Sequence, residues 1–195
     1  MTVGAWALVA ALKLDYLATI WAGFIPVRGD GAVADVPLAP FVLTPLTATL
    51  VHAGLLHLLF NMLMHLFCGR AVEGLLGGRQ LLLLYLVGAY AAAAAQYLVE
   101  PLSAIPMVGA SGAISAVLGA YAMLFGRNRV KIANPMLATL INGLWLMAAW
   151  IVLQLILGYT FGTQGTTIAI AAHIGGFVAG MVLAKPLLLL RYRKA

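Results

Sequence analysis

The stretch Gly109-Ala110-Ser111-Gly112, followed by the apolar run Ala113–Phe125, decides how this chain is interpreted. A serine between glycines at the start of an apolar helix has two interpretations. It allows two membrane helices to pack closely, or it is a nucleophile. The motif alone favours packing, so the choice depends on what the rest of the chain brings to Ser111.

The composition indicates a membrane protein. Of the 195 residues, 64% are hydrophobic and 8% are charged, whereas a soluble domain is about half apolar and about a quarter charged. Because too few polar groups exist to cover a water-facing surface, lipid must be the solvent. A span needs about 20 apolar residues, so we expect an all-α membrane protein, a six-transmembrane-helix bundle forming a single domain over residues 1–195.

Six apolar runs predict the spans, at about 1–25, 50–68, 80–99, 111–125, 135–157 and 167–183. The first run is interrupted by Lys13 and Asp15 and lacks the basic residues that precede the apolar core of a signal peptide. Four prolines and several charges predict a long extramembrane loop over Pro26–Pro45. A basic tail is expected over 185–195.

The basic residues are distributed asymmetrically about these spans. One side would carry Arg70, Arg79, Arg127, Arg129, Lys131, Lys185, Arg191, Arg193 and Lys194. The opposite side has Arg28, with Lys13 unassigned. The positive-inside rule then places both termini in the cytoplasm, and we expect a multi-pass protein of a bacterial cytoplasmic membrane. The net charge of +6 is explained by this topology and not by a nucleic-acid partner.

The same orientation places Ser111 and His173 at a similar depth near the outer leaflet. Two stripes of small residues recur at helical spacing, namely Gly112, Ser115/Ala116 and Gly119, and Ala172, Gly176 and Gly180. Pairing these stripes would bring the two spans close together. The alternative for His173 is a buried histidine bonded to a backbone carbonyl, but ionisable groups inside a bilayer generally mark function.

A serine hydroxyl needs a base within hydrogen-bond reach, and histidine suits that role near neutral pH. None of the five acidic residues lies in the last three spans. The sequence therefore predicts a Ser–His dyad of Ser111 and His173, with the imidazole held by packing.

His57 and Asn61 stand four residues apart and share a helix face. Together with the Ser111 N–H, they are candidate donors for the oxyanion of an acyl-transfer reaction. Interhelical hydrogen bonding explains the pair equally well. His52 lies on a neighbouring face, and we expect His65 to be a packing residue.

The chain lacks the residues on which other kinds of proteolysis within a membrane depend. No H-E-x-x-H motif or pair of intramembrane aspartates is present. The single cysteine, Cys68, is expected to pack as a small apolar residue. We expect neither a metal nor a cofactor.

Four motifs resemble the rhomboid intramembrane serine proteases, in that family's order. They are His52-Ala-Gly-Leu-Leu-His57-Leu-Leu-Phe-Asn61, Gly69-x3-Glu73-x3-Gly77, Gly109-Ala-Ser111-Gly112 and Ala172-His173-x2-Gly176-x3-Gly180. The core of the resemblance covers residues 43–184.

This resemblance implies a six-helix core with a water-accessible cavity, Ser111 as nucleophile and His173 as general base. It implies oxyanion stabilisation by His57, Asn61 and the Ser111 amide, with support from His52 and Gly109. The span 135–157 would gate lateral entry of substrates, and Glu73 would be a structural tie. The implied partners are transmembrane protein substrates and membrane lipid.

Two departures affect these expectations. Many members carry Trp-Arg where this chain has Leu43 and Thr44, which leaves open how the first loop is anchored. Some members stack a tyrosine on the histidine from the position of Ser115. The rival function is a non-catalytic rhomboid-like protein that binds transmembrane helices for quality control, although such a protein would lack the serine or the histidine. A transporter would need inverted repeats and mid-membrane charges.

Overall fold

The computed structural model describes residues 2–31, 38–125, 134–160 and 169–193. The described residues fold into helices, and within them β pairing is limited to one bridge between Phe24 and Met107. The α-helices are α1 (Thr2–Ala11), α2 (Asp15–Ala22), α3 (Thr44–Thr47), α4 (Leu55–Leu76), α5 (Gly78–Val99), α6 (Ser111–Phe125), α7 (Pro135–Thr160) and α8 (Ile170–Tyr192). Short 3-10 turns cover Pro26–Asp30, Phe41–Leu43 and Ala48–Leu50. The predicted all-α membrane fold is confirmed.

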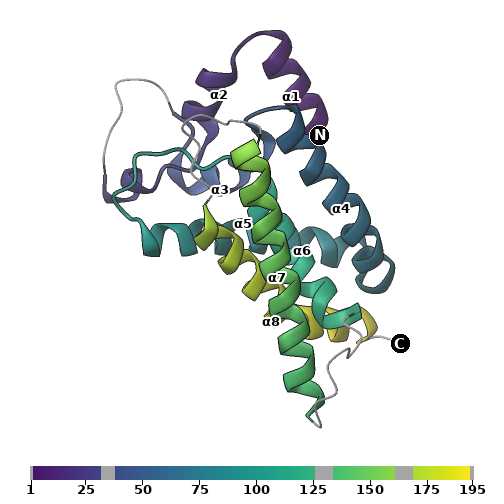
Figure 1. Cartoon of the computed structure of the whole chain (residues 1–195). Helices are drawn as coiled ribbons and strands as arrows, with labels where there is room; N and C mark the ends of the chain where they lie inside the picture. Colours follow the sequence, from purple (N-terminus) through teal and green to yellow (C-terminus); the bar gives the residue numbers. More distant parts are fainter. Residues whose placement is uncertain (1, 32–37, 126–133, 161–168, 194–195) are drawn as a thin grey trace.

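Helix α6 lies at the centre of the bundle, in contact with α4, α5, α7 and α8 (Figure 1). Its side chains are buried along nearly the whole helix, and Ile114, Val117 and Leu118 are completely enclosed. At about 1.5 Å per residue, its 15 residues extend about 22 Å, less than the roughly 30 Å of a bilayer core.

The surrounding helices are long and apolar. Four described segments are long and apolar enough to cross a membrane: α4, α5, Pro135–Leu153 of α7, and α8. Large apolar side chains such as Phe67 and Val182 are exposed on these helices, as expected where lipid is the solvent. Together these features identify an integral membrane protein.

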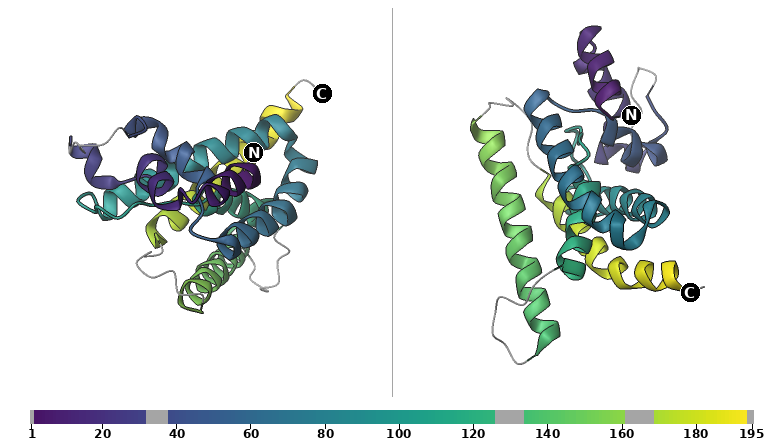
Figure 2. Two further views of the ribbon diagram at one scale, coloured as in Figure 1. Left: turned by 90° about the horizontal axis from the view of Figure 1, so that it is seen from above. Right: turned by 90° about the vertical axis from the view of Figure 1, so that its right-hand side faces the viewer.

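The first predicted span differs from the structure. One helix was expected over about 1–25, but the chain forms α1 and α2, of 10 and 8 residues, joined by a turn in which Lys13 has a φ of +55°. The polar residues Lys13 and Asp15 end one helix and begin the next, since an acidic residue is favoured in a first turn. The two helices project together from one end of the bundle (Figure 2).

Two other boundaries are corrected. Helix α4 begins at Leu55 and ends at Leu76, so His52 lies in the preceding loop and not on the span. The last helix was expected to end near Lys185 and Pro186 but continues to Tyr192. Proline removes a helical hydrogen bond, yet buried Ala184 and Leu187 hold the helix against the bundle on either side of Pro186.

The C-terminal turn of α8 reaches the end of α4. The Arg191 guanidinium lies against Gly77, and the Tyr192 hydroxyl donates to the carbonyl of Leu75 at 3.4 Å. A basic residue of the C-terminal turn thus lies against the α4–α5 turn. Four of the charges used for the topology, Arg127, Arg129, Lys131 and Lys194, lie outside the described residues.

The first loop is anchored without the Trp-Arg pair. Arg28 Nη2 donates to the carbonyl of Ala39 at 2.8 Å, and the Tyr97 hydroxyl of α5 donates to the Asp30 carboxylate at 2.6 Å. Residues 32–37 of the predicted loop lie outside the described residues. The loop is therefore fixed by its own arginine and by the end of α5.

Candidate active site

Helices α6 and α8 touch backbone to backbone. A Cβ atom on Gly176 would overlap the carbonyl oxygen of Gly112, and one on Gly180 would overlap that of Ala116. In the reverse direction, a Cβ on Gly119 would meet the carbonyl of Phe177. The predicted pairing of the two small-residue stripes is confirmed, because only residues without side chains allow so close an approach.

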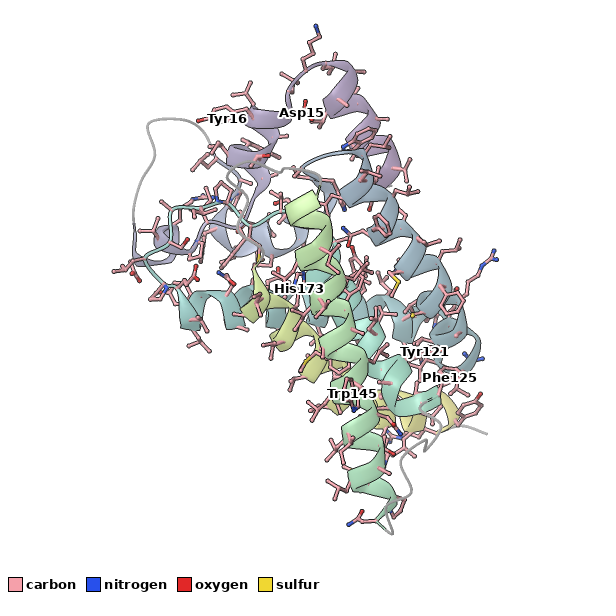
Figure 3. The ribbon with its side chains drawn as sticks, viewed as in Figure 1. Asp15, Tyr16, Tyr121, Phe125, Trp145 and His173 are labelled. Carbon is pink, nitrogen blue, oxygen red and sulfur yellow. The ribbon has the colours of Figure 1, made fainter. Side chains whose placement is uncertain are left out.

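This contact brings Ser111 and His173 together. His173 Nε2 lies 2.8 Å from Ser111 Oγ, although the residues are 62 positions apart. Both are buried, with 4% and 8% of their surfaces exposed. Figure 3 shows His173 inside the bundle, beside α7. With the neutral ring's proton on Nδ1, Nε2 accepts the serine hydroxyl hydrogen, the arrangement that a nucleophile and its base require.

Ser111 is the first residue of α6. The first N–H groups of a helix have no partner within the helix, and they carry its positive dipole end. The serine hydroxyl therefore lies where main-chain donors are concentrated.

Gly109 fixes the chain before the serine. Its φ of +112° lies in the left-handed region, and a Cβ there would come within 2.6 Å of His57 Cε1. Its N–H donates to the carbonyl of Ala48 at 2.9 Å. Both the backbone conformation and the adjacent ring require glycine at this position.

His52 supports the same segment from the preceding loop. The N–H of Ala110 donates to His52 Nε2 at 3.4 Å. Burial, and then the neighbouring His57 ring, lower the pKa of His52 to about 4. The imidazole is thus neutral at physiological pH and keeps the lone pair that accepts this hydrogen bond.

The His57 side chain contacts the segment before Ser111, whereas the Asn61 side chain forms a hydrogen bond within α4. The His57 ring packs against Gly109 and stands edge-on to His52, with ring centroids 5.0 Å apart. Asn61 is 1% exposed, and its Nδ2 donates to the carbonyl of His57 at 2.9 Å. One amide hydrogen is used in that bond and one remains. The oxyanion role of the pair stays a prediction.

His65 and Cys68 occupy packing positions. The His65 ring lies edge-on to Tyr85, with centroids 5.6 Å apart, and Cys68 is buried in the main core. Across the described ranges, no three His, Cys, Asp or Glu side chains are grouped as ligands of a metal would be.

Trp150 was not singled out by sequence reasoning. It is 2% exposed and stands edge-on to the His173 ring, with centroids 6.3 Å apart. Its indole Nε1–H donates to Ser115 Oγ at 2.9 Å. The sequence did contain one indication of this contact, namely Ser115, one turn below Ser111. A hydroxyl on a helix within the membrane requires a hydrogen-bond partner.

Comparisons with known proteins agree with this arrangement. A family model described as "Rhomboid domain" matches residues 42–190. The chain is 32% identical over 142 residues to "Rhomboid protease GluP" of Bacillus subtilis, covering 73% of this chain and 25% of the relative. It is 33% identical to "Rhomboid-related protein 2" of Mus musculus (68% of this chain, 43% of the relative) and 33% identical to "Rhomboid protease GlpG" of Haemophilus influenzae (69% and 64%).

The chain thus spans less than two thirds of each of these relatives. The family match nevertheless covers most of the chain and includes α4 to α8, where the paired helices and the buried serine and histidine lie. This chain belongs to the rhomboid family.

Proposed function

We propose that this chain is an intramembrane serine endopeptidase that hydrolyses peptide bonds in or beside transmembrane segments of other membrane proteins. The observation that carries the proposal is the 2.8 Å contact between His173 Nε2 and Ser111 Oγ inside the bundle. Polar groups are costly in a membrane, and a paired serine and histidine there indicate chemistry. Two of the relatives, those of Bacillus subtilis and Haemophilus influenzae, are named rhomboid proteases, which is consistent with the proposal.

In the first half of the reaction, Ser111 Oγ attacks the scissile carbonyl carbon while its proton passes to His173 Nε2. The carbonyl oxygen becomes an oxyanion. When the tetrahedral intermediate collapses, the C–N bond breaks and His173 gives the proton to the leaving amine. The product is an acyl-enzyme on Ser111.

In the second half, water attacks the ester carbon as His173 takes its proton. Collapse of the second intermediate breaks the bond to Oγ, and the proton returns to Ser111. The dyad is regenerated, and a new carboxylate leaves with the other half of the substrate.

The oxyanion would be stabilised by the Ser111 N–H at the start of α6, with His57 and Asn61 as further donors. The observation that favours this role is the position of the His57 ring against Gly109, two residues before the nucleophile. Preorganised donors of this kind contribute more in a water-poor site than in water.

The shielding of peptide bonds in a helix limits which transmembrane segments can be cleaved. Peptide bonds in a continuous helix are hydrogen-bonded and sterically covered, so a favoured segment has Gly or Pro nearby and unwinds readily. We expect a small residue at the cleavage site. Partners are thus transmembrane proteins within the surrounding lipid.

The decisive experiment uses the purified chain in liposomes with a model transmembrane substrate. Ser111→Ala and His173→Ala should each abolish cleavage. Cys68→Ala, which alters another buried residue, should leave cleavage intact. Cleavage that survives Ser111→Ala, or that chelators abolish, would refute the dyad. Binding of the substrate helix without cleavage by the unmodified chain would instead identify a non-catalytic binding protein.

We also propose that residues 1–195 act as one domain with the C-terminus in the cytoplasm of a bacterial cell. The cytoplasmic N-terminus expected from the sequence depended on a first span, which the structure divides into α1 and α2. The support is the positive-inside rule applied to the basic residues, four of which lie outside the described residues. A reporter that is active only in the cytoplasm should work when fused after residue 195 and fail when inserted in the loop after Pro26. The opposite pattern would reverse the orientation.

A further inference from the structure

The orientation of His173 needs a physical cause. Its Nε2 faces Ser111, while among the described residues its Nδ1 has no hydrogen-bond partner. The two acidic side chains with described hydrogen bonds are committed elsewhere, Asp30 to Tyr97 and Glu100 to Gln96. One hydrogen bond to the serine cannot by itself fix the tilt of an imidazole ring.

The ring is held from the side by Trp150. The two ring planes are at 73° with centroids 6.3 Å apart, an edge-on arrangement that aromatic pairs favour. Trp150 comes from α7, whereas His173 and Ser111 come from α8 and α6. The residue that bounds the imidazole is therefore on a third helix.

Trp150 is itself fixed by a directed hydrogen bond. Its indole N–H donates to Ser115 Oγ at 2.9 Å, and Ser115 Oγ donates to the carbonyl of Ser111 at 2.7 Å. Indole is a donor only, and a hydroxyl both donates and accepts, so the roles along this chain follow without ambiguity. Ser115 is completely buried, so water does not compete for these bonds.

We propose that Trp150, locked by Ser115, is a positioning residue for His173. The two hydrogen bonds link Trp150 through Ser115 to the main-chain carbonyl of Ser111. The indole ring beside His173 is therefore held in a fixed position relative to the serine. The role rests on the proposed proteolytic function. It also has a consequence for α7: the base is held for proton transfer only while α7 is docked on α6.

The kinetic test compares Trp150→Phe, Ser115→Ala and the double variant in liposomes. Phe keeps a ring but removes the indole N–H. Each single variant should lower kcat about three- to tenfold with KM unchanged, the scale of one lost hydrogen bond. The double variant should be no slower than the slower single one, because both remove the same bond.

The matched control is Trp145→Phe. Trp145 is on the same helix, five residues earlier, but 72% of its surface is exposed, and Figure 3 shows it apart from His173. Its kcat should equal that of the unmodified chain. A kcat for Trp150→Phe equal to that of Trp145→Phe, additive losses in the double variant, or a rise in KM alone would overturn the positioning role.

A second readout does not depend on proteolysis. In protein labelled with ¹³C-histidine and held in detergent micelles, the His173 ring signal is the one that His173→Ala removes. Trp150→Phe and Ser115→Ala should shift this signal, and Trp145→Phe should not. An unchanged signal in both variants refutes the inference even if the enzyme cleaves. A shifted signal in a chain that never cleaves supports the contact and refutes the proteolytic function alone.

Discussion

Gly180 of α8 lies so close to the carbonyl oxygen of Ala116 in α6 that a Cβ atom would overlap it. The two helices that carry His173 and Ser111 are thus spaced by their main chains. A backbone carbonyl cannot rotate away from an added methyl group as a side chain can. The contact consequently limits how far the two site residues can separate.

Gly180→Ala should therefore lower the free energy of unfolding by about 1–3 kcal/mol, as overpacking does, and should also reduce cleavage by separating the dyad. Thermal unfolding in detergent and liposome assays measure the two effects. Gly74→Ala is the control, since a Cβ at Gly74 of α4 meets nothing within 4 Å. It should be neutral or slightly stabilising, because alanine favours helices. Equal behaviour of the two variants would contradict the backbone contact.

Gly109→Ala should impair cleavage more than stability. The substitution strains a φ of +112° and pushes the His57 ring, which would stand 2.6 Å from the new methyl group. Gly31→Ala separates the two causes, because Gly31 has a φ of +85° with nothing within 4 Å of its Cβ position. Both variants should lose about 1–2 kcal/mol to strain. Only Gly109→Ala should lower kcat, and a similar kcat for both would exclude a role for His57.

Asn61→Leu distinguishes the two interpretations of the α4 pair. If Asn61 donates to the oxyanion, kcat should fall about a hundredfold or more with KM little changed. If it only joins helices, the melting temperature should fall while the folded fraction keeps its kcat. His65→Phe on the same helix serves as the control, since the His65 ring packs on Tyr85. We expect the first outcome, because His57 and Asn61 share a face and His57 reaches Gly109.

Stability should depend on pH through His52. Its pKa is lowered from about 6.5 to about 4 in the fold, so the unfolded chain binds the proton more readily. The free energy of unfolding that His52 contributes is fully present above pH 6.5, and it is lost as the pH falls from 6.5 towards 4. At most about 3 kcal/mol is involved. His52→Gln keeps an acceptor for the Ala110 N–H and should reduce the loss measured between pH 7 and pH 4.5. An identical pH profile in the variant would show that His52 does not titrate as described.

The sequence predicted the centre of the molecule better than its periphery. The stripes ending at Gly119 and Gly180 lie on helices that contact one another directly, so their spacing contained the information needed to pair them. The split of the first span was signalled by Lys13 and Asp15, but hydropathy alone joined the two halves. Continuation of α8 through Pro186 depends on tertiary contacts of Leu187, which no local pattern reveals.

Trp150 could not be distinguished from Trp145 by local sequence. Both lie in one apolar run, and the contacts that separate them are made with residues of α6 and α8. Ser115 was interpreted as the loss of an aromatic residue from the dyad. Instead, its hydroxyl holds an aromatic residue that comes from another helix. Such an exchange between helices is visible only when the packing is known.

The short length of α6 has a consequence for how the protein responds to its membrane. Lipid of a different thickness acts on helices whose sides it touches, causing tilt or local thinning. Because α6 is enclosed by its neighbours, that adjustment falls on the outer helices. Ser111 therefore keeps its depth relative to the protein in thick and thin bilayers alike. A change of bilayer thickness instead changes which part of a substrate helix lies at the depth of Ser111. Under the proposed function, bilayer thickness should therefore select the site of cleavage while the geometry of Ser111 and His173 stays the same.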